Sequence, residues 1–183
     1  TIIISGAKVS TKLIVIKKFI NKCDYMILGG GILNTFLKAS GYEIGQSLFE
    51  ESLIDEAKSI LQTDAASKII FPTDLICETN SVTKNIGLNS LGEKDIIYDI
   101  GDESINHIKD IIRKSSSIFW NGPLGYIEKK PYDTGTIIHL KTDDDFDNQL
   151  YMCVLSMNGR MSTDRARRIS GINAVDYVYQ WIP

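Results

Sequence analysis

The chain has 183 residues, a mass of 20.5 kDa and a formal net charge of −3 at pH 7. Its hydrophobic fraction of 43% and charged fraction of 23% are typical of a globular domain, which excludes a mostly disordered or fibrous chain. The charge provides no basic field for nucleic acid, and no apolar run is as long as a membrane span, so we expect neither partner. The three cysteines are scattered, without a C-x-x-C spacing, and predict free thiols in a reducing, cytoplasmic setting.

Short isoleucine-rich runs alternate along the chain with longer segments of helical period. Short, continuously apolar runs suit strands that are buried on both faces, and they predict strands at residues 2–5, 25–28, 68–71 and 117–120. Apolar residues at helical spacing predict helices at residues 9–20, 32–39, 53–61 and 105–112. This alternation predicts an α/β fold: a three-layer, Rossmann-like parallel sheet with helices on both faces, formed by residues 1–139.

Two segments depart from the alternation. Residues 74–100 hold several asparagines and glycines among short β-like pieces, so we expect an irregular excursion there. Residues 140–183 carry no pattern that we could assign, and we expect a tail of short helices or disorder that leaves the sheet incomplete. The chain starts with Thr1 inside a strand-like run, without Met, which predicts a fragment of a longer protein.

The first candidate loop, residues 5–12, begins at the end of the first predicted strand. Ligands of open parallel sheets bind beyond the carboxyl ends of the strands. Ser10 is a suitable N-cap for the helix that follows, and free N–H groups at a helix start attract phosphate. Lys8 and Lys12, four residues apart, can direct two ammonium groups at one anion. A plain helix start with two solvated lysines explains the same pattern, and the G-x-x-x-x-G-K-[ST] phosphate loop is absent.

Two further loops follow predicted strands. In Gly29-Gly30-Gly31 the backbone can approach a flat ring or a phosphate, although a tight turn between strand and helix has the same signature. In residues 120–125, Asn121 stands before a Gly122-Pro123 turn, and Glu128 nearby could accept hydrogen bonds from a sugar. A turn without function is the alternative for this loop.

These three loops, in this order and spacing, resemble the C-terminal, nucleotide-binding domain of phosphoglycerate kinases. Other segments fit the same family pattern: Thr35-Phe36-Leu37-Lys38, residues 41–45, Ser47-Leu48, Pro72 with Asp74, Asp99 with Gly101, and Gly135-Thr136. The resemblance covers residues 1 to about 138. The family's later G-G-G-D-T loop, whose aspartate holds the magnesium nucleotide, is absent, as is its S-T-G-G-G-A segment.

The resemblance implies reversible phosphoryl transfer between 1,3-bisphosphoglycerate and ADP, giving 3-phosphoglycerate and ATP in glycolysis. It implies that this domain binds Mg-ADP or Mg-ATP, with magnesium held through the nucleotide phosphates and no metal ligand from the chain. Lys8 would contact the transferring phosphate as the catalytic residue, and Lys12 the nucleotide phosphates. The remaining implied contacts are with adenine (Gly6, Gly29, Gly30, Gly31 and Leu48) and with ribose and phosphates (Asn121, Gly122, Pro123 and Glu128).

In the family, a separate amino-terminal domain binds the phosphoglycerate and supplies a catalytic arginine. We therefore expect this chain to be inactive by itself, and to bind phosphoglycerate only if such a domain is supplied. We also expect a cytoplasmic monomer. Two alternatives stay open on the sequence: a non-catalytic module that binds ADP or ATP, and a degraded gene product.

Overall fold

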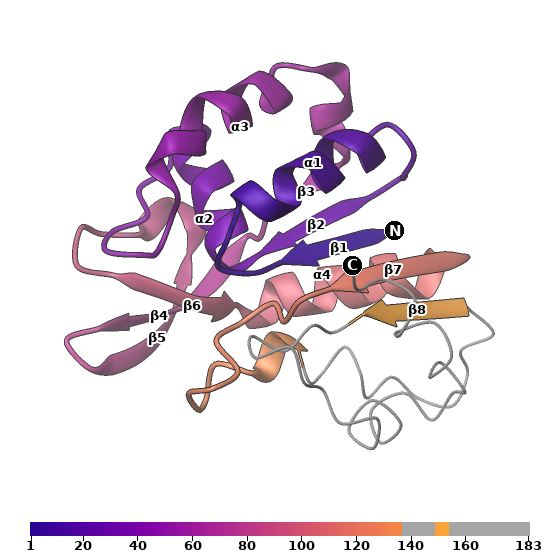
Figure 1. Ribbon diagram of the computed structural model, residues 1–183. Helices are drawn as coiled ribbons and strands as arrows, with labels where there is room; N and C mark the ends of the chain where they lie inside the picture. The colour runs from indigo at the N-terminus through magenta and orange to yellow at the C-terminus, as the bar shows by residue number, and fades with distance from the viewer. Residues whose placement is uncertain (137–148, 154–183) are drawn as a thin grey trace.

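A five-stranded parallel sheet forms the centre of the molecule (Figure 1). The computed structural model describes residues 1–136 and 149–153. The strand order is β3-β2-β1-β7-β8. The strands are β1 (Ile2–Ser5), β2 (Met26–Gly29), β3 (Ile69–Ile70), β7 (Ser117–Asn121) and β8 (Gln149–Cys153). The four predicted strands are confirmed: β1 has its predicted ends, and the ends of β2, β3 and β7 differ by at most one residue.

Helices cover both faces of this sheet, as predicted (Figure 1). They are α1 (Ser10–Phe19), α2 (Gly30–Ala39), α3 (Ile54–Leu61) and α4 (Asp102–Lys114). From β1 the chain passes through α1 to β2, and then through α2 and α3 to β3, always toward the same edge. It then crosses through α4 to β7, which lies on the other side of β1. Because crossovers between parallel strands are right-handed, connections that run in opposite directions along the sheet place their helices on opposite faces.

Residues 74–100 form a second, antiparallel sheet, so the predicted irregular excursion is wrong. Its strands are β4 (Asp74–Thr79), β5 (Val82–Gly87) and β6 (Ile96–Ile100), in the order β5-β4-β6. Asn80 and Ser81 have positive φ angles of 51° and 64°, as the central residues of a two-residue hairpin turn require. The polar and glycine residues that suggested irregular structure therefore mark the turns of a small regular sheet.

Strand β8 lies within residues 140–183, where we expected short helices or disorder. It pairs in parallel with β7 over five residues, from Ser117 opposite Gln149 to Asn121 opposite Cys153. One piece of the predicted tail therefore extends the sheet, and the rest lies outside the described residues.

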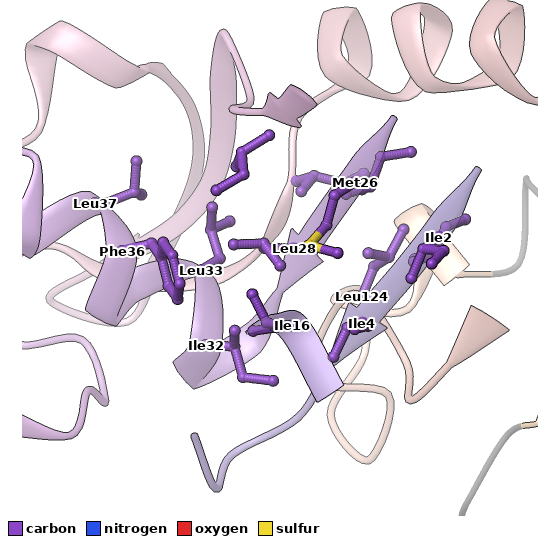
Figure 2. Close-up of a cluster of buried hydrophobic side chains, with 14 of the residues drawn as sticks. Ile2, Ile4, Ile16, Met26, Leu28, Ile32, Leu33, Phe36, Leu37 and Leu124 are labelled. Atoms are coloured by element: carbon purple, nitrogen blue, oxygen red, sulfur yellow. The ribbon is translucent and has the colours of Figure 1, made fainter. Parts of the chain in front are cut away.

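A continuous apolar core holds the carboxyl ends of the strands in place. Ile3 and Ile4 of β1 are completely buried, as are Ile16 of α1 and Phe36 of α2. Figure 2 shows these helices packing their apolar side chains onto β1 and β2. Each such side chain contributes about 1.5–3 kcal/mol by leaving water. Among the described helices, none combines the length and the apolar character needed to cross a bilayer.

Candidate functional site

The three candidate loops begin at neighbouring positions of one sheet edge. At the end of β1, Ser5 pairs with Gly29 of β2, and the preceding Ile4 pairs with Asn121 of β7. All three strands are parallel, so their carboxyl ends point the same way (Figure 1). The loops at residues 5–12, 29–31 and 121–125 thus emerge side by side, as a shared binding site requires.

The first two loops are in direct backbone contact. The N–H of Ile32 donates a 3.3 Å hydrogen bond to the carbonyl oxygen of Gly6. Gly30 has a φ of +59°, and a Cβ placed there would lie 3.1 Å from that same oxygen. Side chains would separate these loops, so the glycines allow the close packing. A Cβ on Gly6 itself would meet no atom of the described residues within 4 Å, so they leave the space beside Gly6 open.

The first and third loops are joined through Ser5, which begins the first loop but is not among the predicted site residues. Its hydroxyl donates a 2.5 Å hydrogen bond to the carbonyl oxygen of Pro123. Gly122 has a φ of +88°, and a Cβ there would lie 2.2 Å from the carbonyl oxygen of Ser5. The Ser5 side chain fits because Gly29, its partner on β2, has none: a Cβ on Gly29 would lie 2.5 Å from the serine hydroxyl oxygen.

The two predicted lysines differ in their surroundings. The ammonium group of Lys12 donates to Oδ1 of the buried Asn121, across the end of β1. Lys8 is exposed, and its ammonium group makes no hydrogen bond or ion pair within residues 1–136. The structure thus brings Lys12 and Asn121 together, and it leaves Lys8, four residues before Lys12, as an accessible positive charge.

The start of α1 corrects the prediction that Ser10 caps this helix. Ser10 is its first residue, and Val9, the N-cap residue, provides no capping hydrogen bond from its side chain. The cap comes from Glu50, whose Oε2 accepts the N–H groups of Val9 at 3.0 Å and Ser10 at 3.2 Å. Two N–H groups that the sequence offered to phosphate are therefore already bonded to a carboxylate.

Leu48 projects from the segment that leads to Glu50. Its carbonyl oxygen accepts a 2.9 Å hydrogen bond from Nδ2 of Asn34 on α2, and its side chain is 61% exposed. Large exposed apolar side chains are costly to hydrate, so Leu48 offers apolar surface to a flat ligand. The Oδ1 atom of Asn34 is buried and has no hydrogen-bond partner among the residues that the structure describes.

A buried carboxylate anchors the loop that follows β7. Asp99 on β6 is 2% exposed, and its Oδ2 accepts the N–H of Gly135 at 2.9 Å. The hydroxyl of the neighbouring Thr136 accepts the N–H of Leu124 at 3.0 Å. Burial raises the pKa of Asp99 to about 7. Hydrogen bonds from the backbone of Gly135 and Ile100 act in the opposite direction, but their effect is smaller than that of burial.

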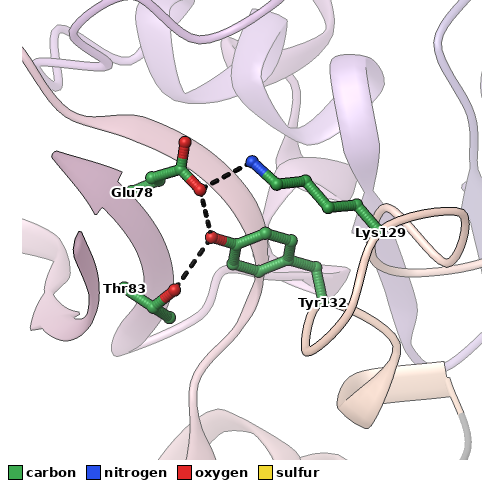
Figure 3. Close-up of polar contacts among 4 residues, drawn as sticks. All are labelled: Glu78, Thr83, Lys129 and Tyr132. Atoms are coloured by element: carbon green, nitrogen blue, oxygen red, sulfur yellow. Dashed lines mark hydrogen bonds and ion pairs between the residues drawn. The ribbon is translucent and has the colours of Figure 1, made fainter. Parts of the chain in front are cut away.

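Glu128 lies on the outer part of this loop, and its side chain is exposed. The next residue, Lys129, forms a 2.7 Å ion pair with Glu78 of β4, and Glu78 also accepts from the Tyr132 hydroxyl at 2.6 Å (Figure 3). The loop is thereby attached to the small sheet. No hydrogen bond within residues 1–136 joins Glu128 to the other predicted site residues.

The chemistry of this edge is that of a site for a polyanion. It combines lysine ammonium groups, an amide side chain and close-packed glycine backbone next to an exposed leucine. Within the described residues there is no group of three or more His, Cys, Asp or Glu side chains placed to hold a metal ion. The arrangement can bind and orient a phosphorylated ligand and neutralise part of its charge.

Comparisons with known proteins point to one family. The family model "Phosphoglycerate kinase" matches residues 1–170, which extends past the residues that carry the motif resemblance. The phosphoglycerate kinase of Mycoplasmoides gallisepticum is 44% identical over 146 residues, covering 74% of this chain and 35% of that protein. That of Bartonella bacilliformis is 38% identical over 143 residues, covering 75% of this chain and 36% of the relative. The chain thus spans about a third of the length of these curated relatives.

Solved structures give the same result for the fold. Phosphoglycerate kinase from Coxiella burnetii superposes with a TM-score of 0.74 at 30% identity, over 84% of this chain and 40% of that one. The enzyme from Pyrococcus horikoshii, at 23% identity, superposes with a TM-score of 0.72 over 84% of this chain and 41% of that one, and shows the shared fold alone. From the family model, the sequence identities and the superpositions together, the chain belongs to the phosphoglycerate kinase family.

Proposed function

We propose that this chain is the nucleotide-binding part of a phosphoglycerate kinase and binds Mg-ADP or Mg-ATP at the carboxyl edge of its sheet. The observation that carries the proposal is the direct bonding among the three loops: Ile32 to Gly6, Ser5 to Pro123, and Lys12 to Asn121. Loops that are bonded to one another form one surface, and that surface carries the positive charge that nucleotide phosphates require.

The proposed roles follow the chemistry of phosphoryl transfer, which depends on positioning and charge neutralisation more than on covalent help from the protein. Lys8, exposed and cationic, would contact the transferring phosphate. Lys12 and Asn121 would hold the nucleotide phosphates, with Gly122 and Pro123 beside them, and Glu128 would accept from the ribose. The adenine would bind between the side chain of Leu48 and the backbone of four glycines, Gly6, Gly29, Gly30 and Gly31. Magnesium, bound to the nucleotide phosphates, would neutralise part of their charge.

For the whole reaction we propose reversible phosphoryl transfer between 1,3-bisphosphoglycerate and ADP, in glycolysis and in the cytoplasm. The chain by itself would bind nucleotide as a monomer without catalysing this reaction. Aligning two reactants can supply about 7–11 kcal/mol of a barrier, whereas a single exposed charge contact is worth about 0.3–1 kcal/mol. The described loops can therefore support nucleotide affinity, but they cannot replace a bound and aligned phosphoglycerate.

Calorimetry with Mg-ADP on the full 183-residue chain tests the binding part of the proposal. Lys8→Ala and Lys12→Ala should each weaken binding about tenfold, which corresponds to about 1.4 kcal/mol. Lys18→Ala is the matched control, because Lys18 is exposed on α1 and makes no ion pair within residues 1–136. No binding by the unmodified chain, or an equal loss in all three variants, would contradict a nucleotide site at this edge.

A second experiment tests the catalytic part. The amino-terminal half of a related phosphoglycerate kinase would be expressed separately and mixed with the chain, and ATP formation from 1,3-bisphosphoglycerate and ADP would be assayed. We expect no activity from the chain alone. Activity of the mixture that is lost with Lys8→Ala would support a split enzyme. Nucleotide binding without activity in the mixture would favour the alternative of a non-catalytic ADP- or ATP-binding module.

A further inference from the structure

A carboxylate from a distant segment holds the turn that carries both lysines. Glu50 lies 41 residues from Val9 in sequence, and its Oε2 accepts the N–H groups of Val9 and Ser10 at 3.0 and 3.2 Å. These two residues lie between Lys8 and Lys12. Because the first turn of α1 has no side-chain cap of its own, Glu50 determines how the chain turns from β1 into the helix.

The backbone of Glu50 is itself held in place by a hydrogen bond to α2. Its backbone N–H donates to Oγ1 of Thr35 on α2 at 3.0 Å, and the hydroxyl of Thr35 donates to the carbonyl oxygen of Gly31 at 2.7 Å. Thr35 is completely buried and so has little freedom to move. One series of hydrogen bonds therefore connects the Gly29-Gly30-Gly31 turn, Glu50 and the lysine turn.

The position of the Glu50 carboxylate also affects where a phosphate can bind. The N-terminus of a helix attracts anions through its free N–H groups and its dipole. At α1 this place is already taken by a negative charge, which would repel a second anion at the same N–H groups. A phosphate near this turn would therefore bind to the ammonium groups of Lys8 and Lys12 rather than to the N–H groups of Val9 and Ser10.

We propose that Glu50 is a positioning residue for the nucleotide phosphates, acting through the turn that carries Lys8 and Lys12. This inference rests on the proposed nucleotide-binding function. Glu50 would not touch the ligand. It would keep the two lysines in a fixed relation to the glycine turn, so that phosphate and adenine are bound at the correct separation.

The test compares ADP with adenosine, which lacks the phosphates. Glu50→Ala should weaken Mg-ADP binding about tenfold in calorimetry. Its affinity for adenosine, followed by NMR titration so that millimolar binding is measurable, should not change. Glu50→Gln keeps an oxygen that can accept from both N–H groups, and should lose less than about threefold. Glu51→Ala is the control, because Glu51 is exposed and its side chain makes no hydrogen bond or ion pair within residues 1–136.

Three results would overturn the inference. Equal losses for ADP and adenosine would show that the variant only loosens the fold. Unchanged ADP binding would show that the turn keeps its shape without Glu50. Tighter ADP binding by Glu50→Ala would show that the carboxylate competes with phosphate. If Glu50→Ala does not fold, as judged by circular dichroism, Glu50→Asp gives the same comparison, because its shorter side chain cannot reach both N–H groups.

A double-mutant cycle shows whether Glu50 acts through Lys8. In a Lys8→Met background, adding Glu50→Ala should weaken ADP binding clearly less than tenfold, because only Lys12 remains to be positioned and coupled residues have non-additive effects. A full tenfold effect in that background would contradict the proposed route. If the unmodified chain binds no ADP, the proposed function fails together with this inference. If it binds ADP and Glu50→Ala makes no difference, only the inference fails.

Discussion

The hydroxyl of Ser5, at the end of β1, donates a 2.5 Å hydrogen bond to the carbonyl oxygen of Pro123, in the loop after β7. Ser5 is 1% exposed, so this bond is protected from water. We predict that Ser5→Ala lowers the free energy of unfolding by about 1 kcal/mol, because it leaves the carbonyl oxygen of Pro123 without this donor. Urea denaturation of both proteins measures the change.

Ser52→Ala is the control for that substitution, because Ser52 is exposed and makes no side-chain hydrogen bond within residues 1–136. Its stability should stay within about 0.5 kcal/mol of the unmodified chain. An equal change in the two variants would mean that the contact between Ser5 and Pro123 contributes nothing to holding the two loops together.

Gly122 and Gly41 provide a matched pair for a second prediction. Their φ angles are nearly the same, +88° and +90°. A Cβ on Gly122 would lie 2.2 Å from the Ser5 carbonyl oxygen, whereas a Cβ on Gly41 would meet no atom within 4 Å in the described part of the chain. Gly41→Ala should cost about 1–2 kcal/mol, from backbone strain alone. Gly122→Ala should cost a further 1–3 kcal/mol from the clash and should reduce ADP binding.

Denaturation and calorimetry on the two alanine variants measure these effects. The difference between the variants isolates the close approach of the β7 loop to β1, because the conformational strain is common to both. If Gly122→Ala proved no worse than Gly41→Ala, the loop could move away from β1 at no cost, and the packing of the site would not depend on this glycine.

The sequence predicted the elements of the central sheet and the loops at its edge, because these features leave a local signal. Buried strands of a parallel sheet are short apolar runs, and β1 matches its predicted residues 2–5 in full. The contacts that assemble the site leave no such signal. Glu50 bonds to a residue 41 positions away, and Ser5 to one 118 positions away, so neither pair could be predicted without the fold.

Apart from strand β8, which lies where we expected short helices or disorder, two errors at the level of elements have a related cause. Asn80 and Ser81 form a hairpin turn between β4 and β5. Strand β5 is mostly exposed and polar, so this part of the chain lacks the continuous apolar runs that identified the strands of the main sheet. Ser10 has the correct residue type for an N-cap, but it stands one position inside the helix. The distant carboxylate of Glu50 provides the cap instead, and so the local preference was overridden by tertiary structure.

Asp99 gives a prediction about pH. Burial raises its pKa from an ordinary value of 3.8 to about 7, so the folded chain holds this proton more tightly than the unfolded chain. Between these two values the unfolded chain releases the proton and the folded chain keeps it, so the contribution of Asp99 to stability falls as the pH rises. Each pKa unit of difference corresponds to about 1.4 kcal/mol.

The comparison with Asp99→Asn isolates this effect, because asparagine does not titrate and the other carboxylates are common to both proteins. The stability of the unmodified chain relative to Asp99→Asn should decrease from pH about 4 to about 7 and stay constant above about 8. Urea denaturation across this range measures it. A relative stability that rises with pH would mean that the hydrogen bonds from Gly135 and Ile100 outweigh burial.

Tyr132 connects the loop that carries Glu128 to the small sheet. Its hydroxyl donates to Oε2 of Glu78 at 2.6 Å and lies 2.9 Å from Oγ1 of Thr83 (Figure 3). Hydrogen bonds from Lys129 and from Tyr132 lower the pKa of Glu78. Tyr132→Phe should therefore raise the pKa of Glu78 partway toward its ordinary value, since Lys129 remains, and should lower the free energy of unfolding by about 1 kcal/mol.

NMR titration of the Glu78 carboxyl group and urea denaturation measure the two effects. Tyr126→Phe is the control, because the Tyr126 ring stacks on Tyr98 but its hydroxyl makes no hydrogen bond within residues 1–136. In this control the pKa of Glu78 should not move. If Tyr132→Phe changes neither quantity, the ion pair between Lys129 and Glu78 is sufficient to hold the loop, and the tyrosine hydroxyl makes no contribution of its own to the position of Glu128.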